Sequence, residues 1–148
     1  MGGEDDSAYD CAVEITRGWE IHENFELYDD VPATFAALRA AGLRIGLVSN
    51  SARDVREFAV HHALEVDAGI SSFHHGRTKP HPSIFRAVLD LLEVEPAEAV
   101  MVGDTIADDI EGAQALGMRA ILVDRGNVQL EFEPRIETLN ELPQLLGL

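Results

Sequence analysis

The sequence predicts an α/β fold in which a mostly parallel β-sheet is flanked by helices. Short apolar segments alternate with amphipathic segments along most of the chain. Strands and helices in this alternation form right-handed βαβ units, which make the strands parallel and cover both faces of the sheet. The 148 residues fit a single domain and show no internal repeat.

Apolar residues at helical spacing predict the helices. In the first helix they recur from Val31 to Leu38, and Gly42 follows as a residue type that favours helix ends. Pro82 suits the first turn of another helix, and Gly117 suits the end of a third. The predicted helices cover residues 31–41, 52–62, 82–92, 109–116 and 136–146.

Continuous apolar runs predict the strands between these helices. Residues 43–49 and 99–102 are the clearest runs, 119–123 is another, and 66–71 is weaker. Ligands bind beyond the carboxyl ends of the strands in parallel sheets. The residues that follow each strand are therefore the first candidates for a functional site.

Composition excludes several classes of function. Eleven basic residues against 27 acidic ones give a net charge of −16, which argues against nucleic-acid and anionic-membrane partners. Cys11 is the only cysteine, and no apolar run approaches the roughly 20 residues that span a bilayer. We therefore expect a cytoplasmic protein. A phosphorylated substrate would need locally placed cations, and Lys79 is the only lysine.

Two polar residues follow the first predicted strand. Ser49 and Asn50 lie just before the helix predicted over residues 52–62, where polar side chains and free backbone N–H groups suit a phosphate oxygen. The alternative is that Ser49 or Ser51 only caps this helix, because serine is a favoured capping residue.

Lys79 and the acids that follow residues 99–102 complete the candidate set. Lys79 precedes the stiff Pro80 backbone, which could hold an ammonium group at a fixed point. Asp104 ends the strand, and Asp108 and Asp109 come about one helical turn later. Asp104 with Asp109 could bind a hard cation such as Mg²⁺. Alternatively, one acid pairs with the lysine, or the later two only stabilise a helix start.

The order of these segments resembles the haloacid dehalogenase superfamily of hydrolases. Residues 46–50 look like its second motif, Lys79-Pro80 like its third and residues 102–109 like its fourth, over about Phe25 to Leu148. The resemblance implies a Rossmann-like core.

It also implies roles for individual residues. Ser49, Asn50 and Lys79 would contact the phosphoryl group, and Lys79 would be the catalytic residue that neutralises it. Mg²⁺ would be the cofactor, ligated by Asp104, with Asp109 or Asp108 as the supporting acid.

The sequence departs from the family pattern near its beginning. Family members begin with an apolar strand that ends in D-x-D, whose first aspartate attacks phosphorus, and no D-x-D occurs here. We therefore expect the first core strand and most of the cap domain to be missing. Residues 1–24 would be a remnant of the cap or connecting segment, and residues 25–148 a partial core. The missing strand would lie centrally, so we expect residues 11–15, or a second copy in a homodimer or strand exchange, to cover the open edge.

The predicted function is Mg²⁺-dependent hydrolysis of a small phosphorylated metabolite by the parent protein. The retained Gly103-Asp104-Thr105 pattern favours this reaction over that of a haloacid dehalogenase-type hydrolase. Because the nucleophile is missing, we expect this chain to be inactive alone and to bind Mg²⁺ weakly. The alternative from another class is a non-catalytic binding or interaction domain that retains the fold.

Overall fold

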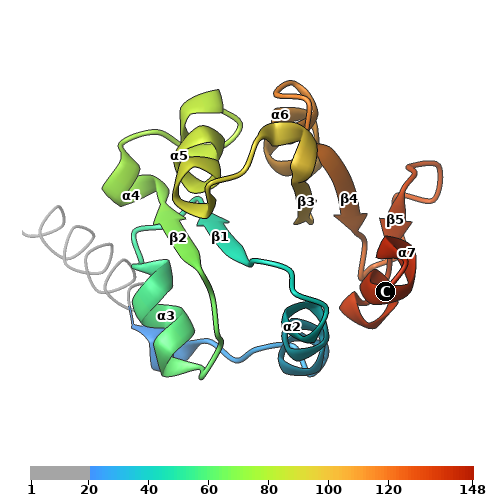
Figure 1. Ribbon diagram of the computed structural model, residues 1–148, viewed down its shortest axis with the longest axis horizontal. Helices are drawn as coiled ribbons and strands as arrows, with labels where there is room; N and C mark the ends of the chain where they lie inside the picture. Colours follow the sequence, from blue (N-terminus) through green and yellow to red (C-terminus); the bar gives the residue numbers. More distant parts are fainter. Residues whose placement is uncertain (1–20) are drawn as a thin grey trace, which may run out of the picture.

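The computed structural model describes residues 21–148, and its strands form two parallel sheets between layers of helices (Figure 1). In the first sheet β1 (Gly46–Ser49) pairs with β2 (Ala68–Ser71). The second has the order β3-β4-β5. Its strands are β3 (Val100–Gly103), β4 (Arg119–Val123) and β5 (Arg135–Ile136). The predicted α/β class with parallel strands and flanking helices is confirmed.

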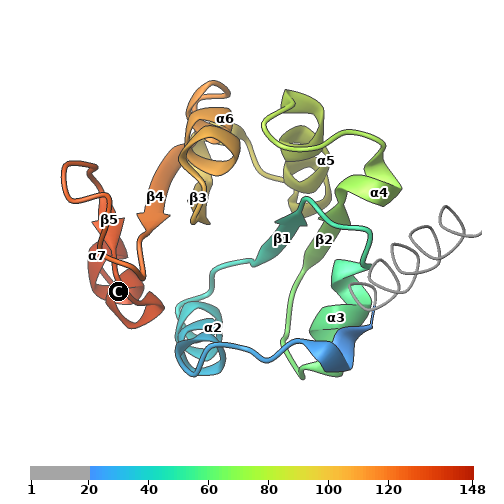
Figure 2. The ribbon, with the colours of Figure 1, turned by 180° about the vertical axis from the view of Figure 1, so that it is seen from behind.

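Helices cover both faces of the row of strands, which runs β2-β1-β3-β4-β5 in Figures 1 and 2. One face carries α2 (Asp30–Ala40), α3 (Val55–His61) and α7 (Leu142–Leu146). The other carries α5 (Pro82–Leu92) and α6 (Glu111–Gln114). Shorter elements connect them: η1 (His22–Asn24), α4 (Ser72–His75), η2 (Pro96–Glu98), the π-helical turn η3 (Ile106–Ile110) and η4 (Leu139–Glu141). No helix within residues 21–148 has the length and apolar composition that a bilayer crossing requires.

The main core lies where α5 packs on the strands. Ile84 and Phe85 of α5 are fully buried, as are Ile110 and Ala113 from the segment after β3. Pro82 stands in the first turn of α5 as predicted, and the His81 side chain accepts a hydrogen bond from the Ser83 N–H. The buried side chains of α5 fix this helix on the strands. They therefore also fix the loop before α5, which carries Lys79, relative to β3.

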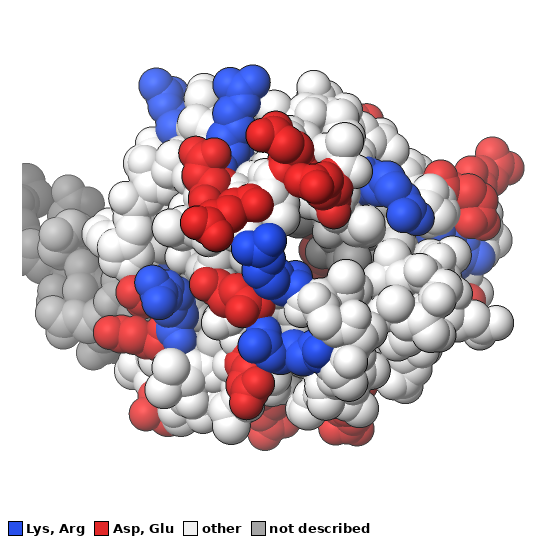
Figure 3. Space-filling view, in the orientation of Figure 1, with Lys and Arg blue, Asp and Glu red and all other residues white. Residues whose placement is uncertain are grey.

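The two sheets do not pair with each other. Within residues 21–148, β1 bonds only to β2 on one side and β3 only to β4 on one side, so both have a free edge. Between these edges lies an apolar groove of about 480 Å³, lined by both strands and by side chains of α2, α5 and α7. Figure 3 shows a recess near the middle of this face of the molecule. The segment 11–15, expected at this position, lies outside the described residues.

An ion pair with a buried carboxylate joins α2 to the carboxyl-terminal part of the chain. Asp30 accepts hydrogen bonds from both Arg125 guanidinium nitrogens at 2.8 and 2.9 Å. It also accepts from the Thr138 hydroxyl at 2.6 Å and the Leu139 N–H at 2.8 Å. The Arg125 hydrogen bond, with smaller help from the other donors, holds the pKa of Asp30 well below 3.8 although burial opposes this. This cluster therefore holds α2 against the segments that follow β4 and β5.

Several predicted boundaries differ from the structure for local reasons. The helix predicted over residues 52–62 begins at Val55, because the Asp54 carboxylate caps it by accepting from the N–H groups of Arg56 and Glu57. The strand predicted over residues 43–49 keeps only its last four residues, Gly46–Ser49.

The carboxyl-terminal half holds two further differences. The helix predicted from residue 136 to 146 is wrong in its first part, because Ile136 is buried in β5 and Thr138 caps η4 before α7 starts. The helix predicted over residues 109–116 is divided between η3 and α6.

Candidate active site

The candidate site forms where the loops after β1 and β3 meet the loop before α5. Asn50, directly after β1, binds the backbone of Lys79 twice. Its Nδ2 donates to the Lys79 carbonyl at 3.1 Å, and its Oδ1 accepts from the Lys79 N–H at 2.7 Å. A side-chain amide that bonds both groups of one residue holds that residue in a fixed orientation. Asn50 thus positions the only lysine of the chain at the carboxyl edge of the sheet.

The Lys79 ammonium group is held by a buried carboxylate. Its Nζ donates to Asp109 Oδ1 at 2.6 Å, and the side chains are 12% and 3% exposed. The other oxygen, Asp109 Oδ2, accepts from the Thr105 N–H at 3.1 Å. Both oxygens of Asp109 are therefore occupied, which suits a role in positioning the lysine.

Gly103 at the end of β3 permits this arrangement. A Cβ added there would overlap the Asp109 carboxylate. The carboxylate consequently packs directly on the backbone at the strand end. Glycine is therefore required before Asp104, because the Asp109 carboxylate lies against this part of the backbone.

The π-helical turn η3 separates the two neighbouring acids. The N–H groups of Asp109 and Ile110 both donate to the Thr105 carbonyl, which widens the turn. Asp109 points inward to Lys79, whereas Asp108 Oδ2 lies 3.5 Å from the Asn50 Nδ2. Asp104 is exposed at the strand end, and its Oδ1 accepts from the Thr105 hydroxyl at 3.3 Å.

The structure brings together five of the six residues predicted for the site. Asn50, Lys79, Asp108 and Asp109 are linked by hydrogen bonds, and Asp104 adjoins them through Thr105. Ser49 is the last residue of β1 and is half-buried. Neither Ser49 nor Ser51 caps α3, since Asp54 has that role.

The carboxylates near Lys79 are the groups that could hold Mg²⁺. Within residues 21–148, no group of three or more His, Cys, Asp or Glu side chains is arranged to hold a metal. Asp109 is already bonded to Lys79, which leaves Asp104 and Asp108 as available carboxylates. Mg²⁺ is often held by one or two carboxylates, with water and substrate phosphate as the other ligands. Two accessible carboxylates beside a lysine fit that mode.

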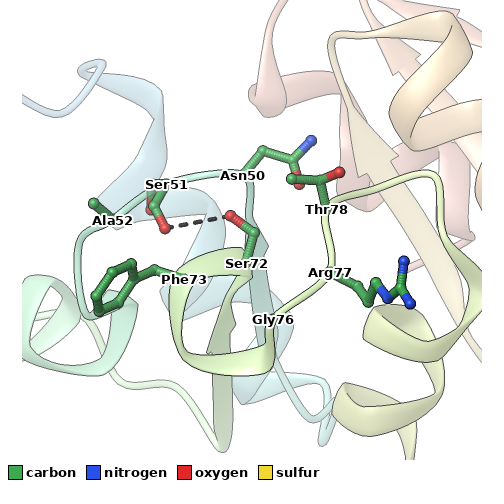
Figure 4. Close-up of a pocket in the computed structure, with 8 residues that line it drawn as sticks. All are labelled: Asn50, Ser51, Ala52, Ser72, Phe73, Gly76, Arg77 and Thr78. Atoms are coloured by element: carbon green, nitrogen blue, oxygen red, sulfur yellow. Dashed lines mark hydrogen bonds between the residues drawn. The ribbon is translucent and has the colours of Figure 1, made fainter.

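A pocket of about 590 Å³ adjoins Asn50 (Figure 4). It lies between the loop after β1 and the segment from α4 to the loop before Lys79, and a Ser72 hydroxyl donates to the Ser51 carbonyl at its wall. Phe73, which is 70% exposed, and Arg77 also line it. No sequence pattern predicted this pocket, because it forms between two loops that are distant in the chain.

Comparison with known proteins places this geometry in a family. The sequence profile of haloacid dehalogenase-like hydrolases matches residues 4–117. The chain belongs to this family. The haloacid dehalogenase-like chain is 33% identical over 132 residues to a phosphoserine phosphatase of Thermus thermophilus, and the match covers 84% of this chain and 50% of the relative. It thus spans about half the length of that curated relative.

Solved structures of the haloacid dehalogenase superfamily agree. A phosphatase from Thermococcus onnurineus superposes with a TM-score of 0.78 at 31% identity, covering 94% of this chain and 64% of that one. A 2-haloacid dehalogenase from Pseudomonas syringae superposes with a TM-score of 0.77 at 28% identity, covering 99% and 64%. The predicted superfamily is confirmed, and both phosphatases and dehalogenases share the fold.

Proposed function

We propose that this chain carries the phosphate-binding and Mg²⁺-binding part of a hydrolase that acts on small phosphomonoesters. The observation that carries the proposal is the position of Lys79. The only lysine of a chain with net charge −16 is fixed through its backbone by Asn50 and through its ammonium group by Asp109. A cation fixed at one point can neutralise charge on a phosphoryl group without reorganising.

The accessible acids support a phosphatase over a dehalogenase. Asp104 and Asp108 would hold Mg²⁺, which would neutralise phosphate oxygens and orient the ester. Release of a halide from carbon requires no metal to screen a phosphate, so these acids would have no such role in a dehalogenase. The organic part of the ester would occupy the pocket beside Asn50. The phosphoserine phosphatase among the relatives supports the reaction class but does not define the substrate of this chain.

We also propose that the chain is inactive alone. Lys79 contacts one carboxylate within the described residues, that of Asp109, whose oxygens are both bonded and whose side chain is 3% exposed. A buried carboxylate that holds the lysine is not free to attack phosphorus. Binding of phosphate should therefore survive while turnover does not.

Calorimetric titration with inorganic phosphate in the presence of Mg²⁺ tests the binding function. Lys79→Met should abolish the binding, while Arg86→Met, which removes an exposed cation on α5, should leave it unchanged. Equal binding by both variants would refute the proposed site. Hydrolysis of an aryl phosphate, measured beside Lys79→Met, tests the second claim. Lysine-dependent turnover would show that the chain has a nucleophile and is active alone.

A further inference from the structure

A turn closed by His81 carries Lys79 into the candidate site. The His81 N–H donates to the Thr78 carbonyl at 2.9 Å, so Lys79 is the second residue of a turn that lies directly before α5. Both backbone groups of Lys79 bond to Asn50. A change at the start of α5 therefore reaches the only lysine of the chain through a short segment that is bonded at both ends.

The His81 side chain caps α5 through a ring nitrogen that carries no proton. Its Nδ1 accepts a hydrogen bond from the Ser83 N–H at 3.2 Å and lies 2.8 Å from the Ser83 hydroxyl oxygen. A ring nitrogen accepts only through its lone pair, so His81 caps the helix as the neutral imidazole with its proton on Nε2. Asparagine and serine cap helices at any pH, whereas histidine loses this acceptor when Nδ1 gains a proton.

A second histidine meets the same hydroxyl group. Nε2 of His75, at the end of α4, lies 2.8 Å from the Ser83 Oγ. In the capped state the His75 Nε2–H donates to the Ser83 oxygen, and the Ser83 O–H donates to the His81 Nδ1. A proton on the His81 Nδ1 reverses this direction, because the ring then donates to Ser83 and the hydroxyl turns toward His75. The Ser83 N–H loses its acceptor, and a positive charge lies at the N-terminal end of the helix dipole.

The charged groups around this turn do not bond to the His81 ring. Within residues 21–148, the ring is hydrogen-bonded to Ser83 alone. Helix α5 packs against β1, β2 and α6, and the two strands carry no charged residue. The charged and titratable side chains on the loop and the neighbouring elements are His75 of α4, Arg77, Lys79, Arg86 of α5, Asp109 of η3 and Glu111 of α6.

These side chains leave the state of the cap to the His81 ring. Asp109 is bonded to Lys79, so it does not meet an imidazolium at position 81. Arg77, Arg86 and Glu111 are exposed, and salt at about 0.15 M screens exposed charges. The proton on the His81 Nδ1 therefore decides whether the first turn of α5 is capped.

We propose that His81 is a positioning residue that makes the site sensitive to pH. As a neutral imidazole it caps α5 and fixes the turn that carries Lys79, and on protonation it releases that turn. This role rests on the proposed phosphate-binding function of Lys79. Histidine side chains change charge between about pH 5 and 8, so phosphate binding is complete at the upper end of this range and weakens as the pH falls.

Calorimetric titration of the full 148-residue chain with inorganic phosphate and Mg²⁺, at about pH 8 and about pH 5.5, tests the proposal. His81→Asn keeps an oxygen that accepts from the Ser83 N–H at both pH values. His61→Asn, which removes an exposed histidine of α3, is the matched control. Phosphate changes its own charge in this range, but it does so equally for every chain, so the ratios of the dissociation constants isolate His81.

The expected effect has the size of one helix cap. Between the two pH values the unaltered chain and His61→Asn should lose about fivefold more affinity than His81→Asn, because loss of a cap typically shifts an equilibrium by about this factor. His81→Ala has no acceptor, so it should bind about fivefold more weakly than His81→Asn at the higher pH.

Nuclear magnetic resonance tests the cap without any ligand. At the higher pH the nitrogen shifts of the His81 ring should show a bare Nδ1 and a proton on Nε2. As the pH falls, the amide signals of Ser83 and Lys79 should shift together with the His81 ring signals. In His81→Asn these amide signals should stay in place.

Three results would overturn the proposal. One is an equal loss of affinity in the unaltered chain and in His81→Asn. Another is a proton on the His81 Nδ1 at the higher pH. The third is the same shift of the Ser83 and Lys79 amide signals in both chains. Absence of phosphate binding at the higher pH would instead refute the proposed function, and the ring and amide signals would still decide whether His81 controls the turn.

Discussion

Replacement of Asp109 by asparagine isolates the energetic role of the buried ion pair. The substitution keeps the size of the side chain and an oxygen for the Thr105 N–H, but it removes the charge that faces Lys79. At a separation of 2.6 Å and an effective dielectric constant of about 20, the attraction lost is about 6 kcal/mol before solvation is counted. Breaking one partner of a buried pair costs about 3–5 kcal/mol in practice.

This loss is large against the total stability of a domain. Domains of this size unfold with a free energy of about 5–15 kcal/mol. With a urea dependence of about 2 kcal/mol per molar, a loss of about 3 kcal/mol lowers the unfolding midpoint by about 1.5 M. Circular dichroism during urea titration measures this midpoint. Asp90→Asn on α5, where the side chain is exposed, is the matched control and should change stability by less than about 0.5 kcal/mol.

A second substitution tests the cause of the loss. Adding Lys79→Met to Asp109→Asn removes the uncompensated ammonium group, so the double variant should recover much of the lost stability. An unfolding midpoint for Asp109→Asn equal to that of Asp90→Asn would refute the reasoning. The reasoning would also be refuted if the double variant were less stable than Asp109→Asn by as much as an independent core substitution costs.

Further predictions concern the supports of the site and the core. Gly103→Ala should destabilise the chain by about 2 kcal/mol and weaken phosphate binding, because its Cβ displaces Asp109; urea unfolding and calorimetry measure both. Asp30→Asn should cost about 3 kcal/mol at neutral pH. The native pKa of Asp30 is held well below 3.8, so its contribution is complete at neutral pH and declines as the pH falls from about 5. The difference in unfolding midpoint between Asp30→Asn and the unaltered chain should therefore shrink in acid. Phe85→Ala should cost about 4 kcal/mol by thermal or urea unfolding, whereas Phe73→Ala should cost little, because Phe85 is fully buried and Phe73 is 70% exposed.

Local sequence patterns predicted much of the fold and indicated which candidate residues would come together at one edge of the strands. Lys79, Asp104 and Asp109 were identifiable because they follow strands or precede a helix, and parallel strands bring their carboxyl ends together. The pairing of Lys79 with one of the acids was among the alternatives. Asp109 rather than Asp108 pairs with Lys79 because of the π-helical turn η3. The spacing of an ordinary α-helix does not predict such a turn.

Long-range contacts explain what the sequence did not predict. The double hydrogen bond between Asn50 and Lys79 joins positions 29 residues apart, and neither residue type alone indicates it. Ile136 fits a helical pattern, but its burial beside Val123 draws it into β5. The cap of α3 at Asp54 was also missed, because Ser49 and Ser51 are equally good capping types.

Because Lys79 is the only lysine, the chain has a single side-chain amine that can be labelled chemically. Amine-reactive reagents can modify only the α-amino group and Lys79, so a label on the internal peptide comes from one defined position. The ammonium group is 12% exposed and bonded to Asp109, which should make its acylation slow in the folded state. The rate of that single modification, read by mass spectrometry, would report how often the ion pair opens and whether a bound anion shields it.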